Sequence, residues 1–293
     1  MQIFIVDAFT SKKFSGNPAG VVLLEKGEKV DEKFMQNLAA ELRYSETAFL
    51  EKLTDDSYNI RFFTPTSEVA LCGHATIASF TVLKELNLVK PNTAATMHTL
   101  AGDLPVHIEE DKIMLEQAAP EAGEILDSEE NILRISQALN IAPEMIGGSL
   151  YNLKPQLVST GLWDIIVPVK TKKTLFEINP DYSSIAELTK EKNAVSIHVF
   201  TLDKKEAVAD CRDFAPLYGI NEEAATGTAN GALTYYLYLY NVINELDKIY
   251  LIHQGESMGR PSKIYAKLVK KGEDIKVLVG GSARILIKGN WVV

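Results

Sequence analysis

The sequence predicts an α+β protein made of two similar domains, each with many short strands curled around one buried helix. Three observations predict this class. A set of motifs occurs twice, two segments are apolar on all sides, and most other segments are short and rich in β-branched residues. The 293 residues are enough for two domains of about 140 residues each.

The internal repeat is clearest around two arginine–proline motifs. "RFFTP" at 61–65 recurs as "RDFAP" at 212–216, and "EVALCGHATIA" at 68–78 aligns with "EEAATGTANGA" at 222–232. The motifs follow in the same order in both halves. This shared order indicates a duplicated domain rather than a chance match.

Each half is expected to contain a strand, a glycine turn, a strand, an amphipathic helix, two strands and an apolar helix. Apolar residues recur with helical spacing at about 31–43 and 181–192, which predicts the amphipathic helices. The apolar helices are expected at about 74–87 and 228–243. A helix that is apolar on all sides must be surrounded by protein. The other expected strands are 96–108, 110–116, 248–254, 263–270 and 274–288.

Composition and charge exclude several kinds of partner. The formal net charge of −9 argues against nucleic acid or an anionic membrane. No window reaches the roughly 18 apolar residues of a membrane helix, and "MQIFIVDAF" has the pattern of a strand rather than of a signal peptide. The two cysteines form no disulfide framework. We therefore expect a cytoplasmic protein with reduced thiols.

The usual metal and cofactor motifs are absent from the sequence. The five histidines show no HxH or HExxH spacing, and Cys72 with His74 lacks the second pair of a zinc site. There is no GxGxxG after a strand, no GxxxxGK[ST] and no G-x-S-x-G elbow. We therefore expect neither a metal nor a cofactor.

Two helix starts, "LCGHAT" and "ATGTAN", are expected to bind carboxylates. Gly73 and Gly227 occupy equivalent positions in them, and glycine lets the backbone approach a ligand closely. The first N–H groups of a helix have no partner within the helix and carry partial positive charge. Two such starts in one cleft between the domains would form a double anion site. The alternative is that both glycines only end loops.

His74 and Thr228 follow these glycines. The helix dipole disfavours an imidazolium at His74, so this ring is expected to be neutral and to donate or accept a hydrogen bond. Thr228 is either a simple helix cap or a hydroxyl that holds a ligand carboxylate.

Glu46 is the candidate for proton transfer. It lies in "SETAFL" at 45–50, which aligns with "SIHVFT" at 196–201, so the second half has Ile197 where the first has Glu46. A carboxylate in a strand of apolar residues has a raised pKa, which suits general acid/base chemistry near neutral pH. The alternative is an ion pair at a strand end. The asymmetry within a duplicated framework favours the catalytic role.

Glu223 is a second asymmetric acid, since its repeat mate is Val69. It could bind a substrate amine or hydroxyl, or cap the following helix. Asn17, in "GNPAG", is a turn residue that could also reach the site. Arg260, in "HQGESMGRPS", belongs to a hairpin or supplies a further contact to an anion.

Five motifs together resemble the PhzF-like phenazine-biosynthesis family, in the right order over essentially the whole chain. They are "DAFTSKKFSGNPAGVVLL", "SETAFL", "RFFTPTSEVALCGHATIA", "EEAATGTANGAL" and "QGESMGRPS". The resemblance implies the diaminopimelate epimerase-like fold, with two pseudo-symmetric domains that are each a barrel-like, mostly antiparallel sheet around a central helix. We expect domains at 1–118, with a C-terminal strand at about 284–293, and at 119–283.

The resemblance also implies a cofactor-independent isomerase that transfers a proton in the cleft between the domains, often as a homodimer. By motif, the family's acid/base glutamate corresponds to Glu46 and its histidine to His74. Its second acid, usually Asp, corresponds to Glu223, and its serine corresponds to Thr228. These two departures keep the chemistry and leave the substrate open. The implied backbone ligands are Gly73 and Gly227.

Three functions remain open from the sequence. The first is an isomerase in which Glu46 moves a proton of a small carboxylate substrate. The second is an amino-acid epimerase or racemase that uses Cys72. Related racemases have a cysteine at each helix start, whereas the second position here is Thr226, which is no base. The third is a non-catalytic protein that binds small acids.

Overall fold

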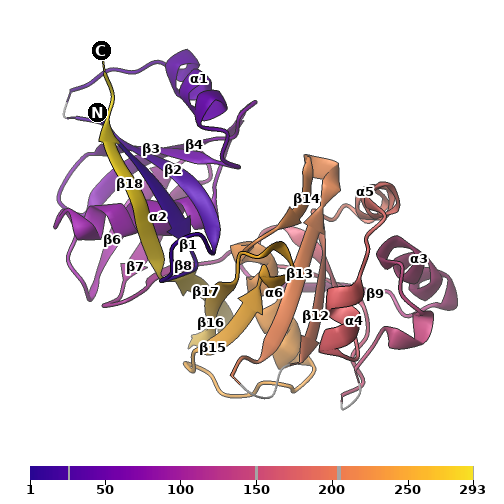
Figure 1. Ribbon diagram of the computed structural model, residues 1–293. Coiled ribbons are helices and arrows are strands. Elements are labelled where there is room, and N and C mark those ends of the chain that lie inside the picture. Colours follow the sequence, from indigo (N-terminus) through magenta and orange to yellow (C-terminus); the bar gives the residue numbers. More distant parts are fainter. Residues whose placement is uncertain (26, 149–150, 203–205, 293) are drawn as a thin grey trace. The chain divides into compact units, whose positions relative to one another are not determined.

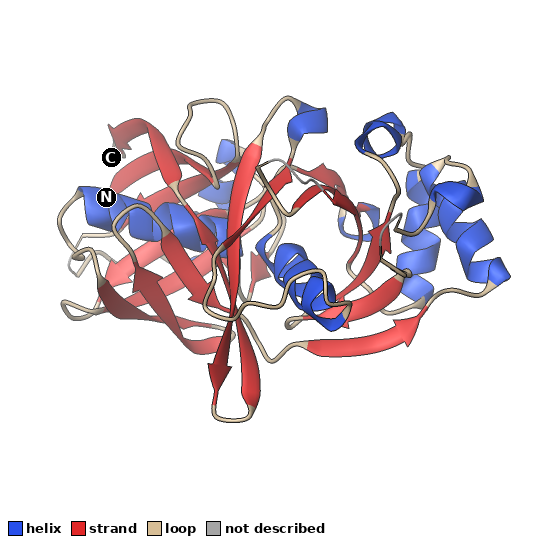
Figure 2. Ribbon diagram, turned by 90° about the horizontal axis from the view of Figure 1, so that it is seen from below, coloured by secondary structure: helices blue, strands red, loops and turns tan. Residues whose placement is uncertain are grey.

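The computed structural model describes the whole chain except residues 26, 149–150, 203–205 and 293 (Figure 1). The described residues form an α+β protein, as the sequence predicts, and strands are the main regular structure (Figure 2). The chain folds into two compact units, which are Met1–Glu116 with Gly280–Val293, and Gln117–Val279. None of the helices in this described part combines the length and the apolar character needed to cross a membrane.

The first unit is a mostly antiparallel sheet with two crossover helices. Its strands are β1 (Gln2–Ala8), β2 (Asn17–Leu23), β3 (Thr47–Lys52), β4 (Ser57–Phe63), β5 (Glu68–Val69), β6 (Thr93–Thr99), β7 (Gly102–Ile108), β8 (Ile113–Glu116) and β18 (Ala283–Asn290). They pair in the order β18–β1–β2–β3–β4–β6–β7–β8, and only β2–β3 and β4–β6 are parallel. A parallel pair needs a crossover connection. The chain supplies α1 (Glu32–Leu42) for the first pair and α2 (Gly73–Glu85) for the second.

The second unit repeats this plan. Its strands are β9 (Glu121–Ile125), β10 (Gln156–Ser159), β11 (Trp163–Pro168), β12 (Ser196–Leu202), β13 (Ala209–Ala215), β14 (Ile220–Glu223), β15 (Tyr250–Gln254) and β16 (Ser262–Lys271), with β17 (Asp274–Gly281) at its end. They pair in the order β9–β10–β11–β12–β13–β15–β16, and only β11–β12 and β13–β15 are parallel. The connection from β11 to β12 contains α4 (Lys172–Glu177) and α5 (Tyr182–Glu191), and that from β13 to β15 contains α6 (Gly227–Leu239).

The two apolar helices, α2 and α6, are buried as the sequence predicts. They start at Gly73 and Gly227, the glycines aligned by the repeat, and most of their side chains are buried. Helix α2 packs on β1, β2, β3, β8 and β18, and α6 packs on β10, β11 and β16. Both end earlier than expected. Asn87 and Asn241 adopt positive φ angles of 57° and 55°, a conformation that stops a helix.

The amphipathic helices α1 and α5 lie within one residue of their expected bounds. Asp31 accepts a hydrogen bond from the N–H of Phe34, and Asp181 accepts hydrogen bonds from the N–H groups of Ser183 and Ser184. These side chains satisfy donors that have no partner within the helix, which fixes where each helix starts.

Three sequence expectations are wrong in detail. The expected strand 96–108 is a hairpin of β6 and β7, with Gly102 at a φ of 106°. The expected strand 274–288 divides into β17 and β18. Helix α3 (Glu129–Leu139) has no counterpart among the expected elements, although Ser128 caps it and its first turn is acidic.

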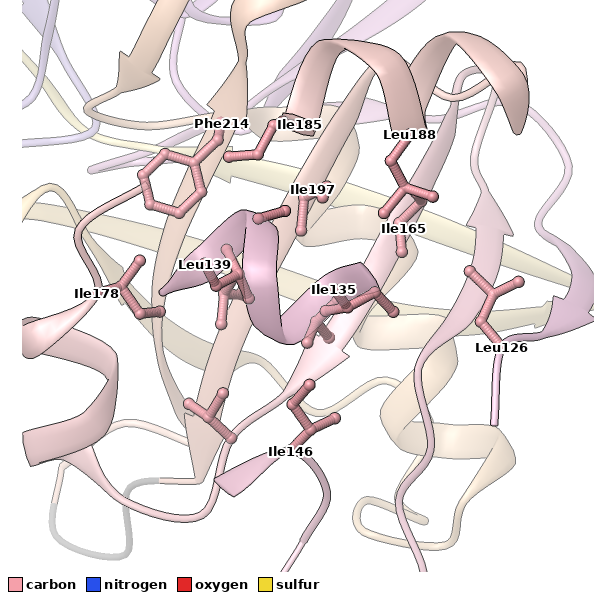
Figure 3. Close-up of a cluster of buried hydrophobic side chains, with 14 of the residues drawn as sticks. Leu126, Ile135, Leu139, Ile146, Ile165, Ile178, Ile185, Leu188, Ile197 and Phe214 are labelled. Atoms are coloured by element: carbon pink, nitrogen blue, oxygen red, sulfur yellow. The ribbon is translucent and has the colours of Figure 1, made fainter. Parts of the chain in front are cut away.

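An apolar core of the second unit covers one face of β11, β12 and β13 (Figure 3). Ile135 and Leu139 of α3 and Leu188 of α5 pack with Ile165 and Ile197 of the strands. Side chains of a strand alternate between its two faces. The residues between these apolar positions, which include Asp164, Ser196, His198 and Asp213, therefore point to the opposite face of the sheet.

Candidate active site

Glu46, Cys72 and His74 meet in the first unit. Glu46 lies directly before β3 rather than within a strand as expected, Cys72 directly precedes α2, and His74 lies in its first turn. An oxygen of the Glu46 carboxylate lies 3.2 Å from Nε2 of His74. The Cys72 sulfur lies 3.4 Å from Nδ1 of the same ring.

The backbone of Glu46 is held by the parallel pairing of β2 and β3. The Gly20 N–H donates to the Glu46 carbonyl oxygen over 3.2 Å. A Cβ atom at Gly20 would lie 2.7 Å from the Thr47 hydroxyl oxygen, so this close approach of the strands needs a glycine. The motif "GNPAG" thereby positions the acid in the next motif.

One oxygen of the partly buried Glu46 carboxylate, Oε2, is a buried acceptor without a good hydrogen bond. This atom is inaccessible to solvent and has no partner with hydrogen-bond geometry among the described residues. The 3.2 Å approach to His74 is thus a short contact of unfavourable direction. The hydroxyl of Ser45 also lies 3.3 Å from His74 Nε2.

His74 is buried, and burial lowers the pKa of its imidazole below the ordinary value of 6.5, while the Glu46 charge opposes part of this shift. The ring is therefore neutral near pH 7, as expected from the sequence, although burial rather than the helix dipole is the main cause.

This shift predicts a pH dependence of stability. The unfolded chain binds a proton at His74 near pH 6.5 and the folded chain only at lower pH. The stability that depends on neutral His74 is thus present above pH 6.5 and lost as the pH falls, by up to about 1.4 kcal/mol per pH unit. Urea unfolding between pH 7.5 and about pH 5 should show a shallower fall for His74→Gln than for the wild type. His107→Gln, on the half-exposed part of β7, is the control, and an equal change in both variants would contradict the assignment.

The start of α2 is open to a ligand. The residue before the helix, Cys72, makes no side-chain capping hydrogen bond. A Cβ atom at Gly73 would meet nothing within 4 Å, so the space beside this backbone is free. The partial positive charge of a helix N-terminus would attract a carboxylate there.

The same three side chains of the first unit could hold a metal ion. One ligand atom from each of Glu46, Cys72 and His74 lies within 4.8 Å of the others. Oxygen, sulfur and nitrogen donors of this kind bind Zn²⁺. A metal ion there would occupy the groups that proton transfer requires.

The other predicted residues are divided between the two units. Asn17 is buried at the start of β2 in the first unit. Glu223 ends β14 in the second unit, where Gly227 and Thr228 begin α6. The Thr228 carbonyl accepts a hydrogen bond from Thr160 over 3.0 Å.

Arg260 lies in the hairpin between β15 and β16 of the second unit. Its backbone N–H donates to the carbonyl oxygen of Gly255 over 3.0 Å. Gly255 has a φ of 78°, and a Cβ atom there would lie 2.5 Å from the Ala224 carbonyl oxygen. The glycine of "QGESMGRPS" is therefore needed for the close approach of this turn to the segment before α6.

Sequence reasoning missed Asp213 and the role of Thr226. The Thr226 hydroxyl lies 2.9 Å from Asp213 and 2.5 Å from Glu223. The signal was present, because Asp213 aligns with Phe62 in the repeat and is therefore a third asymmetric acid.

Residues 6–289 match the PhzC-PhzF family model, described as phenazine biosynthesis-like protein. An uncharacterized isomerase from Clostridium acetobutylicum is 38% identical over 307 aligned positions, which cover 100% of this chain and 98% of the relative. An uncharacterized isomerase from Bacillus subtilis is 33% identical, over 96% of this chain and 95% of the relative.

A solved phenazine biosynthesis protein of the PhzF family from Bacillus anthracis has a TM-score of 0.88 at 26% identity, and the match covers 100% of this chain and 99% of that one. This likeness confirms the predicted fold class. The chain therefore belongs to the PhzC-PhzF family of phenazine biosynthesis-like proteins and is an isomerase, the class in which its curated relatives are named.

Proposed function

We propose that the protein is a cofactor-independent isomerase in which Glu46 moves a proton of a small carboxylate substrate. The observation that carries this proposal is the buried Oε2 atom of Glu46, which has no well-directed hydrogen bond among the described residues. Such an oxygen is suited to take a proton from a carbon acid and to return it elsewhere. The aligned position in the second half of the chain holds Ile197. The fold therefore does not require a carboxylate there, which supports a functional role for Glu46.

His74 and the start of α2 would assist this transfer. Neutral His74 has one N–H group and can donate a hydrogen bond to the substrate. The backbone at Gly73 would bind the substrate carboxylate at the N-terminus of the helix. A carboxylate held by donors acidifies the neighbouring C–H bond, because charge that develops on its oxygens is stabilised. The expected substrates have an acidic C–H next to a double bond or a carbonyl group.

A second candidate is an epimerase that uses Cys72 as a base. The 3.4 Å contact between the Cys72 sulfur and His74 Nδ1 favours it, since a neighbouring imidazole can take the thiol proton. The hydroxyl of Thr226 at the aligned helix start argues against a pair of thiol bases.

The test is proton exchange in D₂O. The protein is incubated with a panel of small unsaturated and 2-oxo carboxylic acids and with amino acids, and the products are followed by ¹H NMR. Deuterium uptake with a shifted double bond or carbonyl supports the isomerase, provided that Cys72→Ala remains active. Inversion of an amino acid that is lost in Cys72→Ala would support the epimerase. Binding of an acid without any exchange would overturn both proposals and leave a non-catalytic binding protein.

A further inference from the structure

The first unit brings three different metal-binding groups together at the start of α2. The sequence offers Cys72 and His74 as a single pair, and the fold adds Glu46 from the position directly before β3. One carboxylate oxygen, the sulfur and one ring nitrogen of these residues lie within 4.8 Å of one another. A metal site needs such convergence, because each donor atom must lie about 2.0–2.3 Å from a common centre.

Two of the three donor separations come within a few tenths of an ångström of those around a tetrahedral ion. Nε2 of His74 lies 3.2 Å from Oε2 of Glu46 and 3.9 Å from the Cys72 sulfur. Bonds of the usual length at tetrahedral angles place neighbouring donors about 3.3–3.6 Å apart. The sulfur lies within 4.8 Å of a carboxylate oxygen. A side-chain movement of about 1 Å therefore brings all three donors into range.

Oε2 of Glu46 is suited to bind a cation. It is inaccessible to solvent and has no partner with hydrogen-bond geometry in the described part of the chain. Nε2 of His74, 3.2 Å away, is an acceptor when the ring hydrogen is on Nδ1. Two lone pairs then face each other, and a metal ion bound by both removes their repulsion. The Ser45 hydroxyl, 3.3 Å from Nε2, is half-buried and can turn toward water.

The donor set selects a soft divalent ion such as Zn²⁺. Thiolate and imidazole ligands favour Zn²⁺ over Mg²⁺ and Ca²⁺, which take oxygen ligands. Neutral His74 brings no charge, whereas a Cys72 thiolate and the Glu46 carboxylate bring one negative charge each. These two charges balance those of Zn²⁺, so the occupied site is electrically neutral. Neutrality matters because an unbalanced charge is costly in buried surroundings.

The second unit provides an internal comparison. The repeat aligns Ile197, Thr226 and Thr228 with the three donors, and an isoleucine with two threonines does not replace a carboxylate, a thiol and an imidazole. Helix α6 nevertheless starts at the aligned Gly227. The duplicated fold therefore does not require the three donors, and their convergence is a property of the first unit alone.

We propose that Glu46, Cys72 and His74 bind a Zn²⁺ ion and that the bound ion blocks proton transfer at Glu46. On binding, the Cys72 S–H bond breaks, a Zn–S bond forms and the thiol proton is released to water. Lone pairs of Glu46 and His74 form the other two bonds, so nothing is oxidised or reduced. A carboxylate oxygen bound to the metal cannot take a proton from a carbon acid. The inhibitory role rests on the proposed isomerase function, whereas metal binding itself does not.

Titration of the metal-free protein with Co²⁺ tests the site without any substrate. Co²⁺ replaces Zn²⁺ in such sites and absorbs visible light strongly when its coordination is tetrahedral, and a sulfur ligand adds a charge-transfer band in the near ultraviolet. One equivalent should produce both signals, and Zn²⁺ should remove them. Cys72→Ser should lose the charge-transfer band. Glu46→Gln should lower the affinity for Co²⁺ by at least about tenfold, because a charged ligand is lost.

Cys211→Ser is the matched control, because Cys211 is the only other cysteine in the sequence and is also buried. It should keep both signals and the wild-type affinity, and thermal unfolding of every variant verifies that the fold is retained. A charge-transfer band that survives in Cys72→Ser overturns the site. Wild-type protein without tetrahedral Co²⁺ absorption overturns it as well.

Deuterium uptake tests the inhibitory role. For any acid that exchanges with the metal-free wild type, one equivalent of Zn²⁺ should lower the rate by a factor of about 100 or more, as expected when a general acid/base group is lost. EDTA should restore the rate, and Mg²⁺ should leave it unchanged. Unchanged exchange in the Zn²⁺-loaded protein overturns the inhibitory role. Tetrahedral Co²⁺ without exchange of any acid rejects only the isomerase function, whereas exchange without metal binding rejects only the metal site.

Discussion

Glu46→Gln is expected to lower the rate of carbon-bound proton exchange by a factor of about 100 to 10,000, the usual loss when a general acid/base group is removed. Glutamine has nearly the same shape as glutamate, so contacts with His74 are kept while the ability to accept a proton disappears. The measurement is deuterium uptake in D₂O by whichever acid of the panel exchanges with the wild-type protein.

Glu51→Gln is the control for this variant. Glu51 lies five residues further along the chain on β3, is half-buried, and is opposite Asn59 of β4. It should exchange at the wild-type rate. Exchange at the wild-type rate in Glu46→Gln would show that another group takes the proton, and unchanged binding of the acid by that variant would confirm an intact fold.

Arg212→Gln is expected to cost about 3–5 kcal/mol of stability, as for other broken buried ion pairs. Arg212 donates to both oxygens of Glu222 over 2.8 Å and to the carbonyl oxygens of Leu175 and Ile178 over 3.2 and 2.8 Å. Its side chain is 8% exposed, and that of Glu222 is 12% exposed. Removal of the guanidinium takes the counter-charge and two hydrogen bonds from the Glu222 carboxylate, which keeps the bond from the Ser257 hydroxyl, and one donor from each carbonyl group.

Arg61 is the matched control, because it is the repeat mate of Arg212. It pairs with Glu68 over 2.6 Å and with Glu32 over 2.9 Å, but its side chain is 27% exposed and that of Glu32 is 70% exposed. Water can replace much of what is lost, so Arg61→Gln should cost about 1 kcal/mol. Urea unfolding measures the free energy of unfolding of both variants. Equal losses would show that burial of an ion pair does not decide how much it contributes to stability.

The repeat in the sequence predicted most of the fold. Apolar segments starting at Gly73 and Gly227 can be stable only when surrounded by strands, so α2 and α6 followed from composition alone. Helix α3 was missed because it lies in a stretch with no aligned counterpart, although its Ser128 cap was readable. The division of 274–288 into two strands depends on pairing partners that are distant in the chain.

For the candidate site, the comparison of the two halves was the most useful guide. Glu46 stands where the repeat has Ile197, and the structure brings it to His74. The same comparison applied to Asp213, whose mate is Phe62, would have pointed to the buried polar contacts that Asp213 makes in the second unit. It was overlooked because a single Asp between Arg212 and Phe214 does not reveal which side chains lie beside it.

By itself, the sequence determined the duplicated architecture, the two buried helices and the acids that break the repeat, because periodicity and composition are properties of a local stretch of chain. Only the tertiary structure decided which polar groups contact one another. Asp164, Ser196 and Asp213 are spread over about fifty positions and meet through the register of β11, β12 and β13. Hydrogen bonds and burial depend on these distances in space, and strand register is set by the packing of the whole sheet.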